Sequence, residues 1–247
     1  MKQNKKREYL ISLGAGKSQI PLIKSAKKKG YYVITIDKNK KAPGKKYSEI
    51  FLNLSTHNFN NIKKKIKKLN KNVIGVINRS SGYSVITAAK LQKFLCLKYS
   101  DPKKLNLILD KKKFVNHCLK FKIPVPLELK KKKSIYKKFP IVVKPAVSNF
   151  GKQGISIVKN KSYLDKSIKI AKKYSKNKLY IIQQFVKGSD IVFMGVVKNK
   201  KVVELTFISE INKIKKNLVR RNVFKNPVSN LSNNMKKKVF KITNKLI

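Results

Sequence analysis

The feature that most constrains this chain is a lysine at the end of a short apolar strand, followed by a small loop with two glycines. Residues 141–143 are all β-branched and predict a buried strand that Lys144 ends. The polar loop 148–154 then leads into a second apolar run over 155–158. Such a loop can direct backbone N–H groups toward an anion, so the stretch is suited to holding phosphate. A plain glycine hairpin beside one of many lysines explains the same residues, and this stretch alone leaves both interpretations open.

Two further motifs accompany this stretch in a fixed order. Residues 110–114, Asp-Lys-Lys-Lys-Phe, and residues 123–126, Ile-Pro-Val-Pro, precede it, and an apolar strand that runs into a Gly-Ser-Asp turn follows over 179–190. In this order and at these separations the motifs resemble the ATP-grasp superfamily, in particular its carbamoyl-phosphate synthase large chain-like and biotin carboxylase-like carboxylate–amine ligases. Together with the N-terminal third, the resemblance covers nearly the whole chain.

The N-terminal third has the pattern of a Rossmann-like half, with an apolar strand over 8–13, a glycine turn, a helix and a second strand over 31–36. The resemblance implies an α/β fold in which a Rossmann-like pre-ATP-grasp domain spans residues 1–105. An incomplete α+β ATP-grasp domain follows over residues 106–247, with its lid at about residues 125–180. The family's remaining C-terminal part is expected to be missing from this chain.

The glycine turn 14–16 invites two familiar nucleotide-binding interpretations, and neither fits. A dinucleotide fingerprint needs a third glycine where Gln19 stands, and a Walker A loop ending at Ser18 needs its first glycine at Ile11. We therefore expect no NAD binding. The resemblance implies that Gly14 lines the substrate side, whereas a tight turn needed only for packing is an equal alternative.

A second polar turn follows the strand predicted over 73–77. Open α/β sheets bind ligands at the carboxyl ends of their parallel strands, so Arg79 and Ser80 are candidates for contact with a substrate carboxylate or phosphate. Arg79 is one of only four arginines in the chain. A surface ion pair explains Arg79 equally well at this point.

Local patterns also predict structure in the second half of the chain. Ser162 and Asp165 resemble a capping box at the start of a helix. Residues 190–197 and 201–208 are expected to pair as a hairpin, and a helix begins near Met235. Mixed strands and helices in this order fit the α+β domain that the resemblance implies.

The charge of the chain raises an alternative function. The 62 basic residues against 10 acidic ones give a formal net charge of +52, which suggests nucleic-acid or other polyanion binding without catalysis. However, arginine, the preferred residue for bidentate base and phosphate recognition, occurs only four times, and lysine is spread over every segment. The pattern is more typical of a genome-wide lysine bias, so we expect salt-sensitive, non-specific binding to polyanions and no specific nucleic-acid partner.

The sequence predicts a cytoplasmic protein. No apolar run approaches the roughly 18 residues of a membrane span, and the basic N-terminus leads directly into a strand rather than into a signal peptide. Cys96 and Cys118 both lie in apolar helical patterns, so reduced core cysteines are expected. His57 and His117 have no Cys or acidic neighbours at metal-ligand spacing. A homodimer is compatible with the sequence, which does not decide the oligomeric state.

The resemblance implies ATP as the cofactor and assigns residues to its phosphates. Lys144 and Lys111 match the family's two phosphate lysines, with the two lysines after Lys111 as register alternatives. Gly151 and Gly154 fit the loop that closes over the phosphates. With water excluded, lysines at this distance from a triphosphate contribute strongly to binding.

The resemblance also assigns residues to the base and the ribose. Gln183 stands where the family usually has an acid that accepts from the adenine amino group, and Gln184 and Val186 would present backbone groups to adenine. Asp190 matches the acid that binds the ribose hydroxyls, one methylene shorter than the usual Glu. Both departures concern nucleotide affinity rather than the fold.

The reaction that the resemblance implies is ligation, in which ATP phosphorylates a carboxylate and an amine or similar nucleophile displaces phosphate from the acylphosphate. Arg220 and Arg221 are candidates for catalytic contacts with the substrate or the γ-phosphate. Mg²⁺ is implied as well, but its family ligands are expected beyond residue 247, since Glu204 and Glu210 lie too early in the chain. We therefore expect ATP and a small-molecule carboxylate as partners, and no metal ligand within this chain.

Overall fold

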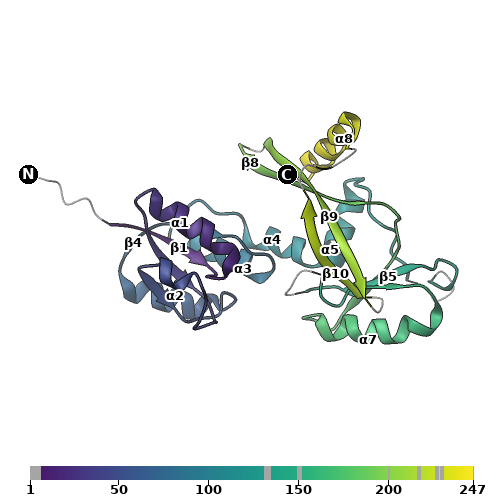
Figure 1. Ribbon diagram of the computed structural model, residues 1–247, viewed down its shortest axis with the longest axis horizontal. Helices are drawn as coiled ribbons and strands as arrows, with labels where there is room; N and C mark the ends of the chain where they lie inside the picture. Colours follow the sequence, from purple (N-terminus) through teal and green to yellow (C-terminus); the bar gives the residue numbers. More distant parts are fainter. Residues whose placement is uncertain are drawn as a thin grey trace, which may run out of the picture. The chain divides into compact units, whose positions relative to one another are not determined.

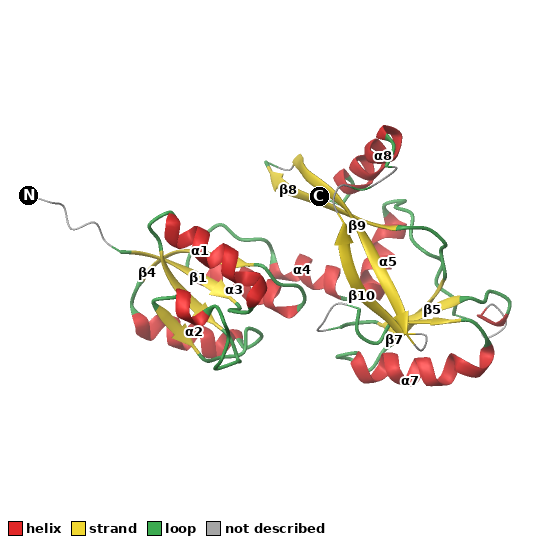
Figure 2. Ribbon diagram, viewed as in Figure 1, coloured by secondary structure: helices red, strands yellow, loops and turns green. Residues whose placement is uncertain are grey.

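The structure is a computed structural model that describes residues 7–130, 135–148, 152–199, 201–215, 218–225, 228 and 231–246 (Figures 1 and 2). The chain divides into two compact units, Met1–Leu109 and Asp110–Ile247, each with its own sheet. This division lies close to the boundary near residue 105 expected from the sequence. No helix in the described ranges is long and apolar enough to cross a membrane.

The first unit is a four-stranded parallel sheet in the order β3-β2-β1-β4, with helices between the strands. Its elements are β1 (Glu8–Leu13), α1 (Ile20–Lys28), β2 (Tyr32–Ile36), β3 (Ile50–Leu52), α2 (Phe59–Leu69), β4 (Asn72–Asn78), α3 (Tyr83–Phe94) and α4 (Pro102–Leu109). Strands β1, β2 and β4 confirm the sequence prediction. β3 was not expected because three residues are too few to show a periodic pattern.

The core of the first unit lies on both faces of this sheet. One cluster contains Ile11 of β1 and Ile62 of α2, and a separate cluster contains Val33 of β2 and Ile23 of α1. Parallel strands covered on both faces need continuous apolar runs, which is why β1 and β2 show no alternation of polar and apolar residues. The sheet is therefore a rigid support for the turns at its carboxyl edge.

The second unit is built on a six-stranded antiparallel sheet in the order β7-β5-β6-β10-β9-β8. Its elements are α5 (Lys111–Lys120), β5 (Ile141–Pro145), β6 (Ser156–Val158), α7 (Leu164–Tyr174), β7 (Tyr180–Gln184), β8 (Asp190–Lys198), β9 (Lys201–Lys215), β10 (Leu218–Lys225) and α8 (Asn233–Asn244). The structure confirms the predicted strands β5 and β6 and the predicted hairpin of β8 with β9. β9 is longer than expected, and β10 was not expected, because two arginines and an asparagine interrupt its apolar pattern.

Helix α7 covers one face of β5, β6 and β7 (Figure 2). Ile141 and Val143 of β5 are fully buried there, together with Val158 of β6 and Ala171 of α7. Alternate residues of β5 point to the other face, so Lys144 is directed away from this core. Burial of β5 from one side thus fixes the side on which its lysine is presented.

Two local predictions were wrong. Ser162 does not cap α7: it lies in a short 3₁₀ turn before the helix, and its Oγ donates to Asn160 Oδ1 over 2.6 Å. Cys96 is exposed rather than in the core, because the chain leaves α3 in a left-handed conformation there, with φ 55°. Cys118 is buried in α5 as predicted, and burial raises the pKa of its thiol.

We predict that Gly154→Ala destabilises the second unit more than Gly30→Ala destabilises the first. Both glycines have positive φ, +73° and +84°, so alanine is strained by about 1–2 kcal/mol at either position. At Gly154 the added Cβ would also lie 2.8 Å from Tyr174 Cβ and 3.0 Å from Pro145 Cγ, whereas nothing lies within 4 Å at Gly30. Crowding of this kind adds about 1–3 kcal/mol.

Urea unfolding followed by circular dichroism measures both losses. Equal decreases in the free energy of unfolding for the two variants would show that the packing around Gly154 relaxes at no cost.

Candidate functional site

The second unit contains a cavity of about 740 Å³ on the face of the sheet opposite α7. Apolar side chains including Val142, Ile157 and Phe185 line part of it. Its polar lining comprises Lys144, Lys152, Gln183, Gln184, Ser189, Asp190, Ser209, Glu210, Asn212 and Lys225. A concave, partly apolar site with a few convergent charged groups is typical of small-molecule binding.

Lys144 of the cavity lining and its neighbour Lys111 form a partly buried lysine pair. Burial, reinforced by the positive charge of Lys111, lowers the pKa of Lys144 from 10.5 to about 8. Burial also lowers the pKa of Lys111, although the Asp110 carboxylate opposes this shift. The Nζ of Lys111 donates to Ser148 Oγ over 2.9 Å, within the segment that follows β5. Two ammonium groups that destabilise one another provide a ready site for an anion.

The local fold explains why Lys111, and not a neighbouring lysine, takes this place. The Asp110 carboxylate caps α5 by accepting from the backbone N–H groups of Lys112 and Lys113, at 3.0 and 3.2 Å. The N–H of Lys111 donates to Ala146 O, which ties the start of α5 to the end of β5. The side chains of Lys112 and Lys113 are exposed. Of these three lysines, Lys111 is the one whose charge acts on Lys144.

Gln183, which also lines the cavity, contains an unsatisfied acceptor. Its side chain is 1% exposed, and its Nε2 donates to the Pro126 carbonyl over 2.9 Å. Because a carbonyl oxygen can only accept, this bond fixes which way the amide points. Its Oε1 is buried with no hydrogen-bond partner. A buried acceptor of this kind is costly unless a ligand supplies a donor.

The neighbours of Gln183 are placed less uniformly. The N–H of Gln184 donates to Leu127 O over 2.9 Å, so this donor is already used within the protein. Val186 is 65% exposed at the mouth of the cavity. Both residues line the cavity. Their predicted backbone contacts with a base stay predictions. The N–H of Gln184 cannot take part in them because it already donates to Leu127 O.

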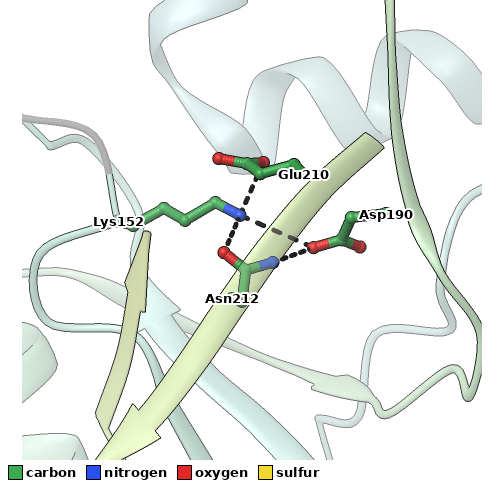
Figure 3. Close-up of polar contacts among 4 residues, drawn as sticks. All are labelled: Lys152, Asp190, Glu210 and Asn212. Carbon is green, nitrogen blue, oxygen red and sulfur yellow. Dashed lines mark hydrogen bonds and ion pairs between the residues drawn. The ribbon is translucent and has the colours of Figure 1, made fainter. Parts of the chain in front are cut away.

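A cluster that the sequence analysis did not find joins the glycine loop to β8 and β9 (Figure 3). The Nζ of Lys152 donates to Glu210 Oε2 and to Asn212 Oδ1, both at 2.7 Å, and lies 3.5 Å from Asp190 Oδ2. The amide of Asn212 also donates to Asp190 Oδ2. The one signal in the sequence was the hairpin itself, since its register pairs Asp190 with Glu210.

The acidic residues that line the cavity are Asp190 and Glu210. No group of three or more His, Cys, Asp or Glu residues that could hold a metal ion occurs among the described residues. The carboxylates of Asp190 and Glu210 are both engaged with the Lys152 ammonium.

Three of the predicted site residues lie partly or wholly outside the described residues. Gly151 is one of them. The backbones of Arg220 and Arg221 lie in β10, opposite Lys213 and Asn212 of β9, but their side chains are outside the described part. Their predicted contacts therefore stay predictions.

In the first unit the structure brings Gly14, Arg79 and Ser80 together at the carboxyl ends of β1 and β4. Gly14 has φ +100°, and a Cβ there would lie 3.2 Å from Cδ of Gln19. Gln19 Nε2 donates to Arg79 O over 2.7 Å, and Arg79 Nη1 donates to Ser18 O over 2.8 Å. Ser80 Oγ reaches the carbonyl of Leu13 at 3.4 Å. The guanidinium is thus tied by a backbone contact to the 3₁₀ turn Lys17–Gln19, which follows the glycine turn.

Comparison with known proteins identifies the family. An ATP-grasp domain is matched over residues 108–247, more than half of the chain, so the protein belongs to the ATP-grasp family. No match was found among curated protein sequences.

Solved structures extend the similarity in fold to both units. The chain is similar to phosphoribosylglycinamide synthetase from Anaerococcus prevotii, with 17% identity and a TM-score of 0.72 over 98% of this chain and 61% of that chain. It is also similar to L-amino acid ligase from Bacillus licheniformis, with 16% identity and a TM-score of 0.75 over 98% and 60% of the two chains. N5-carboxyaminoimidazole ribonucleotide synthetase from Thermotoga maritima matches with 18% identity and a TM-score of 0.66 over 96% and 60%. The chain spans about three fifths of the length of these proteins.

We predict that Lys111→Met raises the pKa of Lys144 above about 8. The substitution removes the neighbouring positive charge, but the larger effect of burial remains, so the pKa stays below 10.5. An NMR titration of the lysine side chains labelled with ¹³C at Cε measures the shift.

The matched control is Lys112→Met, which removes an exposed lysine one residue further on. An unchanged pKa of Lys144 in Lys111→Met, or an equal rise in both variants, would show that Lys111 does not act on Lys144 directly.

Proposed function

We propose that the protein is an ATP-dependent ligase of the ATP-grasp type, which joins a carboxylate to an amine or similar nucleophile through an acylphosphate. The observation that carries this proposal is that one cavity is lined by Lys144, a partly buried lysine beside Lys111, and by Gln183 with its buried, unsatisfied acceptor. ATP has a matching group for each: an anionic triphosphate for the lysines and an amino group for the Gln183 acceptor. The names of the similar solved structures, which include two synthetases and a ligase, support the reaction class.

The lysine pair would bind the phosphates. An anion between Lys144 and Lys111 relieves their mutual repulsion and favours the protonated form of each. Because both are partly buried, their attraction for phosphate is screened less than that of exposed lysines. The lysines of this pair therefore differ physically from the many exposed lysines of the chain.

Gln183 would select the base. Its Oε1 is suited to accept from the exocyclic amino group of adenine, whereas guanine presents a carbonyl oxygen at the same ring position. A glutamate would place a carboxylate oxygen next to the Pro126 carbonyl, where Gln183 Nε2 now donates. The glutamine is thus matched to this carbonyl, and it recognises adenine without adding negative charge near the phosphates.

Asp190 would bind the ribose, and Arg79 and Ser80 in the first unit are candidates for contact with the carboxylate substrate. In the proposed reaction the substrate carboxylate attacks the γ-phosphorus and ADP leaves. The amine then attacks the acyl carbon and expels phosphate. The residues of this chain would contribute positioning and charge neutralisation to the first step. Mg²⁺ is expected to accompany ATP.

Polyanion binding through the net charge of +52 is the alternative. It would arise from lysines over the whole surface and would fall steeply with salt. The two functions differ in which lysines matter, because only the nucleotide site depends on Lys144 and Lys111.

We predict that Lys144→Ala weakens ATP binding by about 10–100-fold, since a hydrogen bond to a charged group contributes about 1.5–3 kcal/mol. Isothermal titration calorimetry at physiological salt measures the change. Lys159→Ala, which removes an exposed lysine after β6, is the matched control and should bind as the parent does. Equal losses in the two variants would favour general polyanion binding, and unchanged binding in Lys144→Ala would remove Lys144 from the site.

We predict that Gln183→Leu reduces the preference for ATP over GTP by about tenfold or more, because it removes the acceptor for the adenine amino group. Competition of each nucleotide with a fluorescent ATP analogue measures the preference. The substitution also leaves the Pro126 carbonyl without its donor, so a thermal melt establishes that the variant is folded. A folded variant that keeps the parent's preference would contradict the assigned role of Gln183.

A further inference from the structure

Lys152 connects two walls of the cavity. It belongs to the glycine loop between β5 and β6, and its ammonium group reaches Glu210 and Asn212 of β9, each at 2.7 Å (Figure 3). The Oδ2 atom of Asp190, at the start of β8, lies 3.5 Å away. All four residues line the same cavity.

The contact with Glu210 is the strongest of the three. The side chains of Lys152 and Glu210 are 22% and 7% exposed, whereas that of Asp190 is 57% exposed. A charge pair removed from solvent is screened little, so its two charges attract one another strongly. An exposed pair contributes far less. Glu210 is therefore the residue that holds Lys152 in place.

The backbone of the loop needs such a contact. Lys152 has φ 58° and Gly154 has φ +73°, so the chain passes through the left-handed region twice within three residues. A residue with a Cβ adopts this conformation only where surrounding contacts offset the strain. The ion pair with Glu210 supplies that contact at the strained lysine.

The lysine also changes the charge that a nucleotide meets. Asp190 and Glu210 place two carboxylates in a cavity that is proposed to hold a triphosphate. The Lys152 ammonium lies within 4 Å of both and offsets part of their repulsion toward phosphate. In addition, Asn212 bonds to Lys152 and to Asp190, so the lysine orients the Asp190 carboxylate indirectly.

We propose that Lys152 is a positioning residue whose ion pair with Glu210 fastens the glycine loop to β9 and so retains the nucleotide in the cavity. The inference rests on the proposed nucleotide function for the identity of the ligand. The fastening itself is a property of the nucleotide-free protein and can be tested separately.

The first experiment measures hydrogen exchange of the peptide 152–158 in the full chain without nucleotide. Lys152→Ala and Glu210→Gln should each increase exchange in this peptide by about tenfold or more, and the double variant should add little to either. Lys159→Ala, an exposed lysine directly after the peptide, should leave exchange unchanged. Unchanged exchange in Lys152→Ala would overturn the proposal, whether or not ATP binds.

The second experiment measures the dissociation rate of a fluorescent ATP analogue by stopped flow. Lys152→Ala should increase the rate by about tenfold, and Lys152→Arg, which keeps the charge, should restore at least half of the parent's residence time. Slower dissociation in Lys152→Ala would show that Lys152 competes with the nucleotide and would overturn the proposal, as would an arginine variant that behaves like alanine. Absence of ATP binding by the parent itself would contradict the proposed function, while the exchange experiment would still decide on the fastening.

Discussion

The antiparallel pairing of β5 with both β6 and β7 is the constraint on which the cavity of the second unit depends. It places Val142 of β5 opposite Gln183 of β7, so the side chains of Gln183 and Lys144 lie on the same face of the sheet. It also returns the chain along β5 as β6, and Lys152, just before β6, lines the cavity on that face. Because α7 covers the opposite face, these polar groups all lie on one side of the sheet.

The charged residues of the cavity are not a single basic patch, because Asp190 and Glu210 lie among its lysines. The positive charge of Lys111 contributes to the lowered pKa of Lys144, whereas Lys152 forms an ion pair with Glu210. A chain with a net charge of +52 has no shortage of cations, so their number explains little. What distinguishes the site is burial, which lowers the pKa of Lys144 and of Lys111 and strengthens the ion pair of Lys152 with Glu210.

Much of the fold was predictable from sequence because its strands are buried on at least one face and its turns contain glycine. The strand with Lys144 at its end, the strand that contains Gln183 and the turn at Gly14 were all placed correctly. β3 and β10 were not, since a three-residue edge strand and a strand interrupted by polar residues carry no periodic signal. Ser162 fitted a capping pattern but lies in a 3₁₀ turn, which shows that a two-residue pattern does not fix where a helix begins.

The sequence by itself determined which elements Lys144, Lys111 and Gln183 belong to, because each is tied to a strand or a helix start with a clear local signal. Only the tertiary structure decided the surroundings of these residues. Strand register brought Asp190 opposite Glu210, and the return of the glycine loop brought Lys152 to both. The fold also left Gln183 Oε1 buried without a partner and lowered the pKa of Lys144. Such properties depend on burial and on contacts between residues distant in the chain, which a local sequence pattern does not contain.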